Sequence, residues 1–422
     1  MTKGSRRDSL NLSNEEKLFV LIAEYVSSDT DEENMTGVLS ELLNDGIEWD
    51  YFLRLAESHD YLAAAYRFFL DYEILAGLPG QVRVLLENEY LLSQARFAKK
   101  ESELVEILDA LETHGIDVVV FKGIPLAHIF YNDPGIRVSK DIDILIDKAQ
   151  VESAQQVLGD NGFSLYTGWL KEADWRTYHF HLIYTRGENM DIVIELHWIL
   201  LDPNKDHEMD CEVVRRQAVS MKIQGRKVET LSQPHALWFA CMHLSYKVYL
   251  DVRGLAELKR LAAKMDESAW EYVFSWAQET RTLDQLKLAF AISESVFGAY
   301  LEESISLRLK PSRFVRTFIL SMYYPRGLVW DHVPFLGTHQ MVVMLSLRQG
   351  FRRKMSFLYN LIFPDRKALY EVYPGKFIET AETRRRFHIK GIYVFLKVIV
   401  LTFLMGFLVQ SKSLGERMLD PV

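Results

Sequence analysis

The spacing of apolar residues changes abruptly at Ile116, and this change limits the possible folds more than any other feature. Before it, residues 14–110 carry apolar side chains at intervals of three and four, with few Gly or Pro residues, which predicts helices. From Ile116 the apolar runs become short, β-branched and alternating, which predicts strands. From Pro234 the helical spacing returns. The sequence therefore predicts a small α/β unit held between two helical regions.

We expect three regions along the chain. Residues 1–100 form an N-terminal helical region, residues 101–230 an α/β core, and residues 231–422 a C-terminal helical region with an apolar segment at 391–409. A length of 422 residues fits two to three domains at roughly 150 residues each. The predicted fold class is α+β, with a small mixed sheet flanked by helical regions.

Within the core, the pattern predicts strands and helices in alternation. A helix from Val82 to Leu111 precedes it. The predicted strands are IDVVVF from Ile116, DIDILI from Asp141, HLIYTR from His181 and MDIVIELHWIL from Met190. Between the first two strands lie a short helix from Ile124 to Tyr131 and a turn at residues 132–135, and a further helix runs from Ala149 to Asn161.

Two carboxylates, Asp141 and Asp143, lie two residues apart on a predicted strand. Residues at this spacing point to the same face, roughly 6–7 Å apart. Like charges so placed repel unless a cation lies between them, and a divalent ion that prefers oxygen ligands fills that role. A bare pair of this kind also occurs on strands whose polar face is simply solvated.

A later strand offers a third carboxylate. Glu195 and His197 alternate with apolar residues and so share one face. If this strand lies beside the first acidic one, Glu195 completes a trio with Asp141 and Asp143. Three carboxylates that hold Mg²⁺ or Mn²⁺ are what nucleotidyl transfer needs, because the metal neutralises the triphosphate and aligns the attacking group.

Lys122 and Gly123 end the first strand and open the helix that follows. A glycine there lets the backbone approach a phosphate, and a helix N-terminus offers unpaired N–H groups. Lys122 could contact the triphosphate as a point charge. Lys-Gly alone is a weak signal, and it indicates a phosphate site here because it lies between a strand and a helix, ahead of the acidic strand.

Other polar residues leave two interpretations open. Arg137 could grip a phosphate bidentately or pair with a carboxylate such as Asp133. His197 could contact substrate or a metal-bound water, or could orient a ligand from behind. His179 and His181 share a face of their predicted strand and could bind metal or simply pack.

The chain resembles the polymerase-β-like nucleotidyltransferase superfamily, and more narrowly a family of nucleotidyltransferases found in lasso-peptide and other biosynthetic gene clusters. The matching residues occur in the family's order: Lys122, Gly123, Leu126, Ala127, Tyr131, Asp133, Pro134, Arg137, Asp141, Asp143, Glu195, His197 and Trp198. The superfamily's usual Gly-Gly or Gly-Ser pair is Lys122-Gly123 here.

The resemblance implies a metal-dependent nucleotidyltransferase that moves a nucleoside monophosphate from an NTP to an unidentified acceptor and releases pyrophosphate. Asp141, Asp143 and Glu195 would hold Mg²⁺ or Mn²⁺ and catalyse, and Lys122, Gly123 and Arg137 would bind the nucleotide. Two rival functions stay open. One is a glycosyltransferase that holds a nucleotide sugar through its DxD motif, and the other is a non-catalytic binding protein of the same fold.

Charge and composition bear on acceptor and compartment. The formal net charge of −9 gives no general attraction for nucleic acid, so a small molecule or peptide is favoured over long nucleic acid. Two cysteines and an N-terminus without an apolar stretch predict a cytoplasmic protein. Residues 391–409 are almost wholly apolar but include Lys397, so both a buried C-terminal helix and membrane contact stay open.

Overall fold

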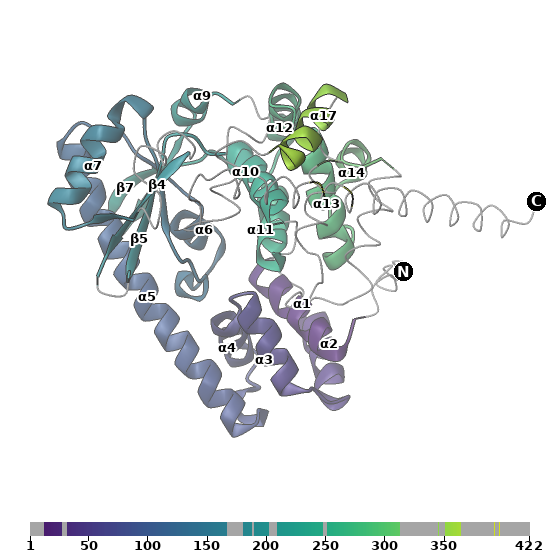
Figure 1. Cartoon of the computed structure of the whole chain (residues 1–422). Helices are drawn as coiled ribbons and strands as arrows, with labels where there is room; N and C mark the ends of the chain where they lie inside the picture. The colour runs from purple at the N-terminus through teal and green to yellow at the C-terminus, as the bar shows by residue number, and fades with distance from the viewer. Residues whose placement is uncertain are drawn as a thin grey trace, which may run out of the picture.

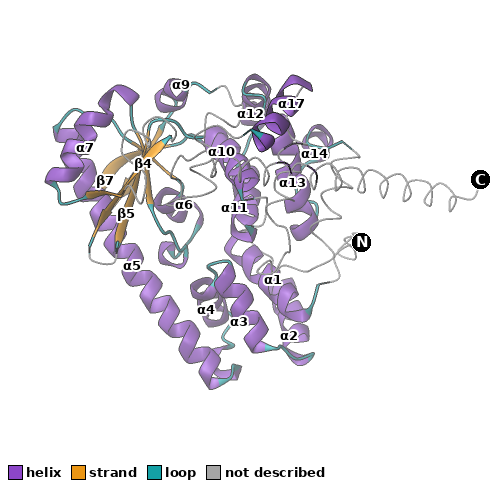
Figure 2. Cartoon of the chain, in the orientation of Figure 1, coloured by secondary structure: helices purple, strands orange, loops and turns teal. Residues whose placement is uncertain are grey.

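The computed structural model describes residues 12–27, 32–166, 180–187, 190–201, 209–247, 251–312 and 351–363, together with Leu345, Ile392 and Leu396. Within these residues a seven-stranded mixed sheet lies beside a large group of helices, as Figures 1 and 2 show. The predicted α+β class is confirmed.

Along the chain, helices come before, among and after the strands of the sheet. Those before it are α1 (Asn14–Ser27), α2 (Glu32–Asn44), α3 (Trp49–Ser58), α4 (Leu62–Asp71) and α5 (Gly80–Thr113). Those among the strands are α6 (Gly123–Phe130), α7 (Val151–Asp160) and α9 (Cys211–Arg216). Those after it are α10 (Gln233–Tyr246), α11 (Val252–Ala263), α12 (Glu267–Glu279), α13 (Leu283–Phe297), α14 (Glu303–Arg308) and α17 (Phe351–Ile362). Short 3-10 helices lie at Leu75–Gly77, Pro134–Ile136 and Lys148–Gln150.

The strands follow the order β3-β4-β5-β2-β1-β7-β6 across the sheet. Their bounds are β1 (Val119–Phe121), β2 (Ile142–Leu145), β3 (Ser164–Tyr166), β4 (His181–Arg186), β5 (Ile192–His197), β6 (Val219–Ile223) and β7 (Arg226–Thr230). β2 runs parallel to β5 and β1 parallel to β7, whereas the other neighbours are antiparallel. The expectation that the Glu195 strand lies beside the Asp143 strand is therefore confirmed.

Alternation within the strands gives the sheet two different faces. One face is apolar and packs on α5 and α7; its buried residues are Ile142, Ile144, Ile194, Leu196, Leu104, Leu108, Ala154 and Val157. The other face carries Phe121, whose ring meets that of Phe239 of α10 at 5.3 Å. Asp143 pairs with Phe121 in the β1–β2 register and shares this second face. The acidic residues thus face the C-terminal helices.

The helices before and after the sheet share one hydrophobic core. Buried residues of α1, such as Leu18 and Ile22, belong to the same core as Leu258 of α11 and Leu286 of α13. α5 runs without a break past the predicted boundary at residue 100, and Figure 1 shows it passing from the sheet to α4. The division into three regions stays a prediction.

The apolar segment 391–409 lies outside the described residues, except for Ile392 and Leu396. Both are exposed, at 45% and 54%. Among the described residues, none of the helices is long and apolar enough to cross a membrane. Contact of this segment with a membrane stays a prediction.

Candidate functional site

Two adjacent parallel strands bring the three carboxylates together. Asp143 of β2 lies directly opposite Glu195 of β5, and Asp141 immediately precedes β2. One ligand oxygen from each carboxylate lies within 4.8 Å of the others. The Asp143 side chain is fully buried, whereas that of Glu195 is 20% exposed. Ile142 and Ile144 anchor the strand in the apolar core, as their alternation predicts.

Lys122 projects its amine into this acidic trio. Its Nζ donates to Oδ1 of Asp143 at 2.5 Å and lies 3.9 Å from Oε2 of Glu195. The rings of Phe121 and Phe239 lie 5.5 and 5.7 Å from the amine, which is within reach of cation–π attraction. Lys122 lies between β1 and α6 and has φ +57° and ψ −131°, a positive φ of the kind that favours glycine. Holding the amine in this place therefore costs the chain free energy as backbone strain.

His197 lies behind the trio, two residues after Glu195 on β5. Its Nε2 is 3.2 Å from both Oδ1 of Asp143 and Oε2 of Glu195. Burial opposes a charge on this ring, but the hydrogen bonds to the two carboxylates outweigh burial and raise the pKa of His197. His181 is its cross-strand partner and, with Glu195 and His197, forms a second group of ligand atoms within 4.8 Å.

The surroundings shift the pKa values of two carboxylates, Asp141 and Glu195, in opposite directions. Burial and the charges of Asp143 and Glu195 raise the pKa of Asp141 to about 6. Burial also opposes ionisation of Glu195, but the hydrogen bond from His197 and the charge of Lys122 lower its pKa to about 2. Glu195 is therefore ionised throughout the neutral range, and Asp141 exchanges a proton more readily than Glu195 does.

The trio has the donor set of a divalent metal site. Oδ2 of Asp143 is buried and has no hydrogen-bond partner among the described residues. A buried carboxylate oxygen is costly to leave unpaired, so its position beside two more carboxylates fits an oxygen-preferring ion. Asp141, Asp143 and Glu195 would hold Mg²⁺ or Mn²⁺, as the sequence predicts.

The profile of a family described as uncharacterised nucleotidyltransferases matches residues 45–298, well over half of the chain. The chain belongs to this nucleotidyltransferase family. The match begins before α3 and ends at α13, so the family includes helices on both sides of the sheet.

Two solved structures are similar to parts of the chain. One is the antibiotic-resistance factor ANT(2'')-Ia, which is 13% identical, with coverage of 43% of this chain and 92% of that chain and a TM-score of 0.31. The other is an antigenic nucleotidyltransferase-like protein from Paracoccidioides brasiliensis, which is 16% identical, with coverage of 49% and 96% and a TM-score of 0.29. None of the curated proteins matches the chain.

Gly123 begins α6 directly beside the trio and is buried. A Cβ at this position would lie 2.8 Å from Oγ of Ser139, which in turn donates to the carbonyl oxygen of Asp141. A larger residue here would therefore force the Ser139 hydroxyl away from this carbonyl oxygen. Its predicted contact with nucleotide stays a prediction.

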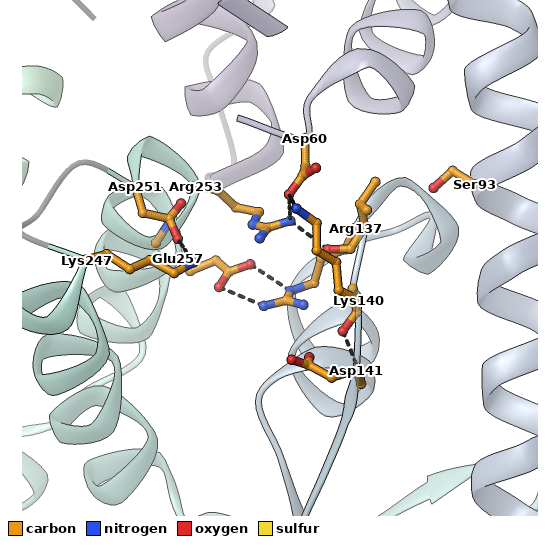
Figure 3. A network of polar contacts seen from close by, with 12 residues as sticks. Asp60, Ser93, Arg137, Lys140, Asp141, Lys247, Asp251, Arg253 and Glu257 are labelled. Atoms are coloured by element: carbon orange, nitrogen blue, oxygen red, sulfur yellow. Dashed lines mark hydrogen bonds and ion pairs between the residues drawn. The ribbon is translucent and has the colours of Figure 1, made fainter. Parts of the chain in front are cut away.

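Arg137 lies in a different environment from the trio. Its guanidinium makes two bonds to Glu257 of α11, at 2.7 and 3.1 Å, and is buried. Figure 3 shows this pair, with Asp60 and Arg253 as a second ion pair nearby. A carboxylate partner was one of the two alternatives for Arg137, but Asp133 instead accepts bonds from Tyr90 and Gln94. The nucleotide contact of Arg137 stays a prediction.

A cavity of about 180 Å³ opens beside Lys122, between the sheet and helices α10 and α11. Phe239 and His243 of α10 line it, with their rings stacked at 6.1 Å. Burial, together with the charge of Lys122, lowers the pKa of His243 to about 3, so the ring is neutral. The sequence did not predict this cavity, because α10 lies more than a hundred residues after β1. The aromatic side chains of α10 predicted only a place in the core.

Proposed function

We propose that the chain is a metal-dependent nucleotidyltransferase that transfers a nucleoside monophosphate from an NTP to a small-molecule or peptide acceptor. The observation that carries this proposal is the acidic trio on adjacent strands, with an unpaired buried oxygen on Asp143 and the amine of Lys122 beside it. Membership in a nucleotidyltransferase family supports the same chemistry and implies a nucleotide substrate.

In this proposal the acceptor's hydroxyl or amine attacks the α-phosphorus, the bond from that phosphorus to the bridging oxygen breaks, and pyrophosphate leaves. Asp141 takes the acceptor's proton on a carboxylate oxygen as the general base. Mg²⁺ or Mn²⁺ held by the trio supplies positive charge to the triphosphate.

The remaining residues bind and orient. Lys122 contributes a positive charge to the triphosphate from the lining of the cavity. Gly123 lets the start of α6 approach a phosphate, as the N–H groups of a helix N-terminus favour. Arg137 lines the same cavity and would contact the nucleotide from its paired position on Glu257.

A second candidate is a non-catalytic protein that binds nucleotide at the same place. Three clustered carboxylates ordinarily need a bound cation to offset their repulsion. Here Lys122 and His197 already offset part of it, so the cluster can persist without turnover. A glycosyltransferase has no comparable support, because the family match is to nucleotidyltransferases.

Transfer of label from NTPs labelled at the α-phosphate separates these candidates. We expect purified protein with Mg²⁺ and a cell extract to attach the label to an acceptor, and Asp143→Asn to abolish the transfer. Lys140→Ala serves as a control, because this neighbouring side chain is 80% exposed. Metal-dependent NTP binding without transfer would contradict the enzyme and support the binding protein. Turnover of nucleotide sugars instead of NTPs would support the glycosyltransferase.

A further inference from the structure

The amine of Lys122 lies near two carboxylates of the trio, those of Asp143 and Glu195. Its Nζ lies 2.5 Å from Asp143 and 3.9 Å from Glu195. Enzymes that use two metals hold them about 3.5–4 Å apart on shared carboxylates. An ion bridging Asp143 and Glu195 on this side would meet the ammonium group at close range, where like charges repel strongly.

The local structure fixes the amine in that place. The positive-φ backbone of Lys122 directs its side chain across the end of β1, and its side chain is only 20% exposed. Phe121 and Phe239 flank the amine on neighbouring elements. A long side chain held by strained backbone, two rings and an ion pair is not a mobile surface lysine.

The balance of charge points the same way. The three carboxylates carry up to −3, and Lys122, with His197 beside them, offsets part of that charge. One divalent ion suffices to neutralise what remains, whereas two would leave an excess of positive charge. The unpaired Oδ2 of Asp143, which the amine does not bond, and the carboxylate of Asp141 offer ligand atoms for one ion.

We propose that Lys122 is a tethered cation that replaces one of two metal ions, so that the chain binds a single divalent cation at the trio. The inference deepens the proposed function, on which it rests for its meaning in catalysis. The amine supplies part of the positive charge that a second metal would place on the triphosphate, and its removal frees a second metal position.

The number of bound Mn²⁺ ions tests this inference directly. We would titrate metal-stripped protein without nucleotide and measure free Mn²⁺ by electron paramagnetic resonance. Wild type is expected to bind one ion, and Lys122→Ala two. Lys122→Met, which keeps the bulk of the side chain, is also expected to bind two. Lys140→Ala removes the same charge next to Asp141 from an 80% exposed side chain and is expected to bind one.

The inference would be overturned if wild type bound two ions or if both Lys122 variants bound one. It would also be overturned if wild type and the Lys122 variants bound the same number of ions. Circular dichroism and thermal unfolding would verify that each variant folds, and the two Lys122 variants guard against a failure of either one. Because the count is made without NTP, it does not depend on transfer. If the Lys122 variants bound two ions and wild type one, but the protein never transferred label, the tethered cation would be upheld and the proposed enzymatic activity would be rejected.

Discussion

At the scale of single residues, the site depends on side chains placed by alternation and on one strained lysine. Asp141, Asp143 and Glu195 could be predicted from sequence because residues at even spacing on a strand share a face. The amine of Lys122 could not be placed so closely. Its position depends on a φ of +57°, which the sequence does not signal for a lysine.

We predict that Lys122→Gly is more stable than Lys122→Ala by about 1 kcal/mol, because both lose the amine but only glycine relaxes the positive-φ backbone. Urea unfolding of the two variants measures the difference in the free energy of unfolding. Equal stability, or a more stable alanine variant, would show that the backbone of Lys122 carries no strain.

At the scale of secondary-structure elements, the sequence predicted those with a clear hydrophobic period. Apolar and polar residues alternate along β2, β4 and β5, and the sequence predicted these strands, as it predicted α5. The hairpin of β6 and β7 was missed, although Val219, Met221 and Ile223 alternate with polar residues along β6, which is mostly exposed. Its turn, Gln224-Gly225, has positive φ at both residues, as a two-residue hairpin loop requires. Pairing of β7 with β1 spans about a hundred residues and has no local signal.

α10 offers a test of pH dependence away from the acidic trio. His235 is fully buried between Ser232 and Tyr272, and burial lowers its pKa to about 4. The unfolded chain therefore binds a proton at higher pH than the folded chain does. Stability falls as the pH drops from about 6.5 to 4, by up to about 1.4 kcal/mol per pH unit from this group.

We predict that His235→Gln shows a shallower loss of stability over this range than wild type, as measured by urea unfolding at pH 7, 6 and 5. The difference between the two proteins isolates His235 from carboxylates that titrate in both. Identical slopes would mean that His235 takes up its proton at the same pH in the folded and the unfolded protein, which would contradict the prediction.

At the scale of the whole molecule, buried ion pairs connect the sheet region to the helices around it. Glu257 of α11 binds Arg137, which precedes β2, and also accepts a bond from Tyr131 at the end of α6. Figure 3 shows Arg253 of the same helix reaching Asp60, which follows α3. Partners 120 residues apart, as Arg137 and Glu257 are, could not be paired from one sequence.

We predict that Glu257→Ala lowers the free energy of unfolding by about 3–5 kcal/mol, because it leaves the charge of Arg137 buried and unpaired. The double variant Arg137→Met/Glu257→Leu should lose less than the single one, since neither charge remains. Glu271→Ala, which breaks the exposed pair with Arg308, is the control and should change stability little. A double variant less stable than Glu257→Ala would contradict this account.

Pyrophosphate release tests the central claim most directly, namely that the trio and Lys122 form a site for nucleotidyl transfer. We would supply each NTP in turn to wild type and Asp143→Asn, with Mg²⁺ or Mn²⁺ and cell extract as the source of acceptor. We predict release by wild type that stops on chelation of metal and is absent in Asp143→Asn. Release that persists in Asp143→Asn, or no release with any NTP, would contradict the claim.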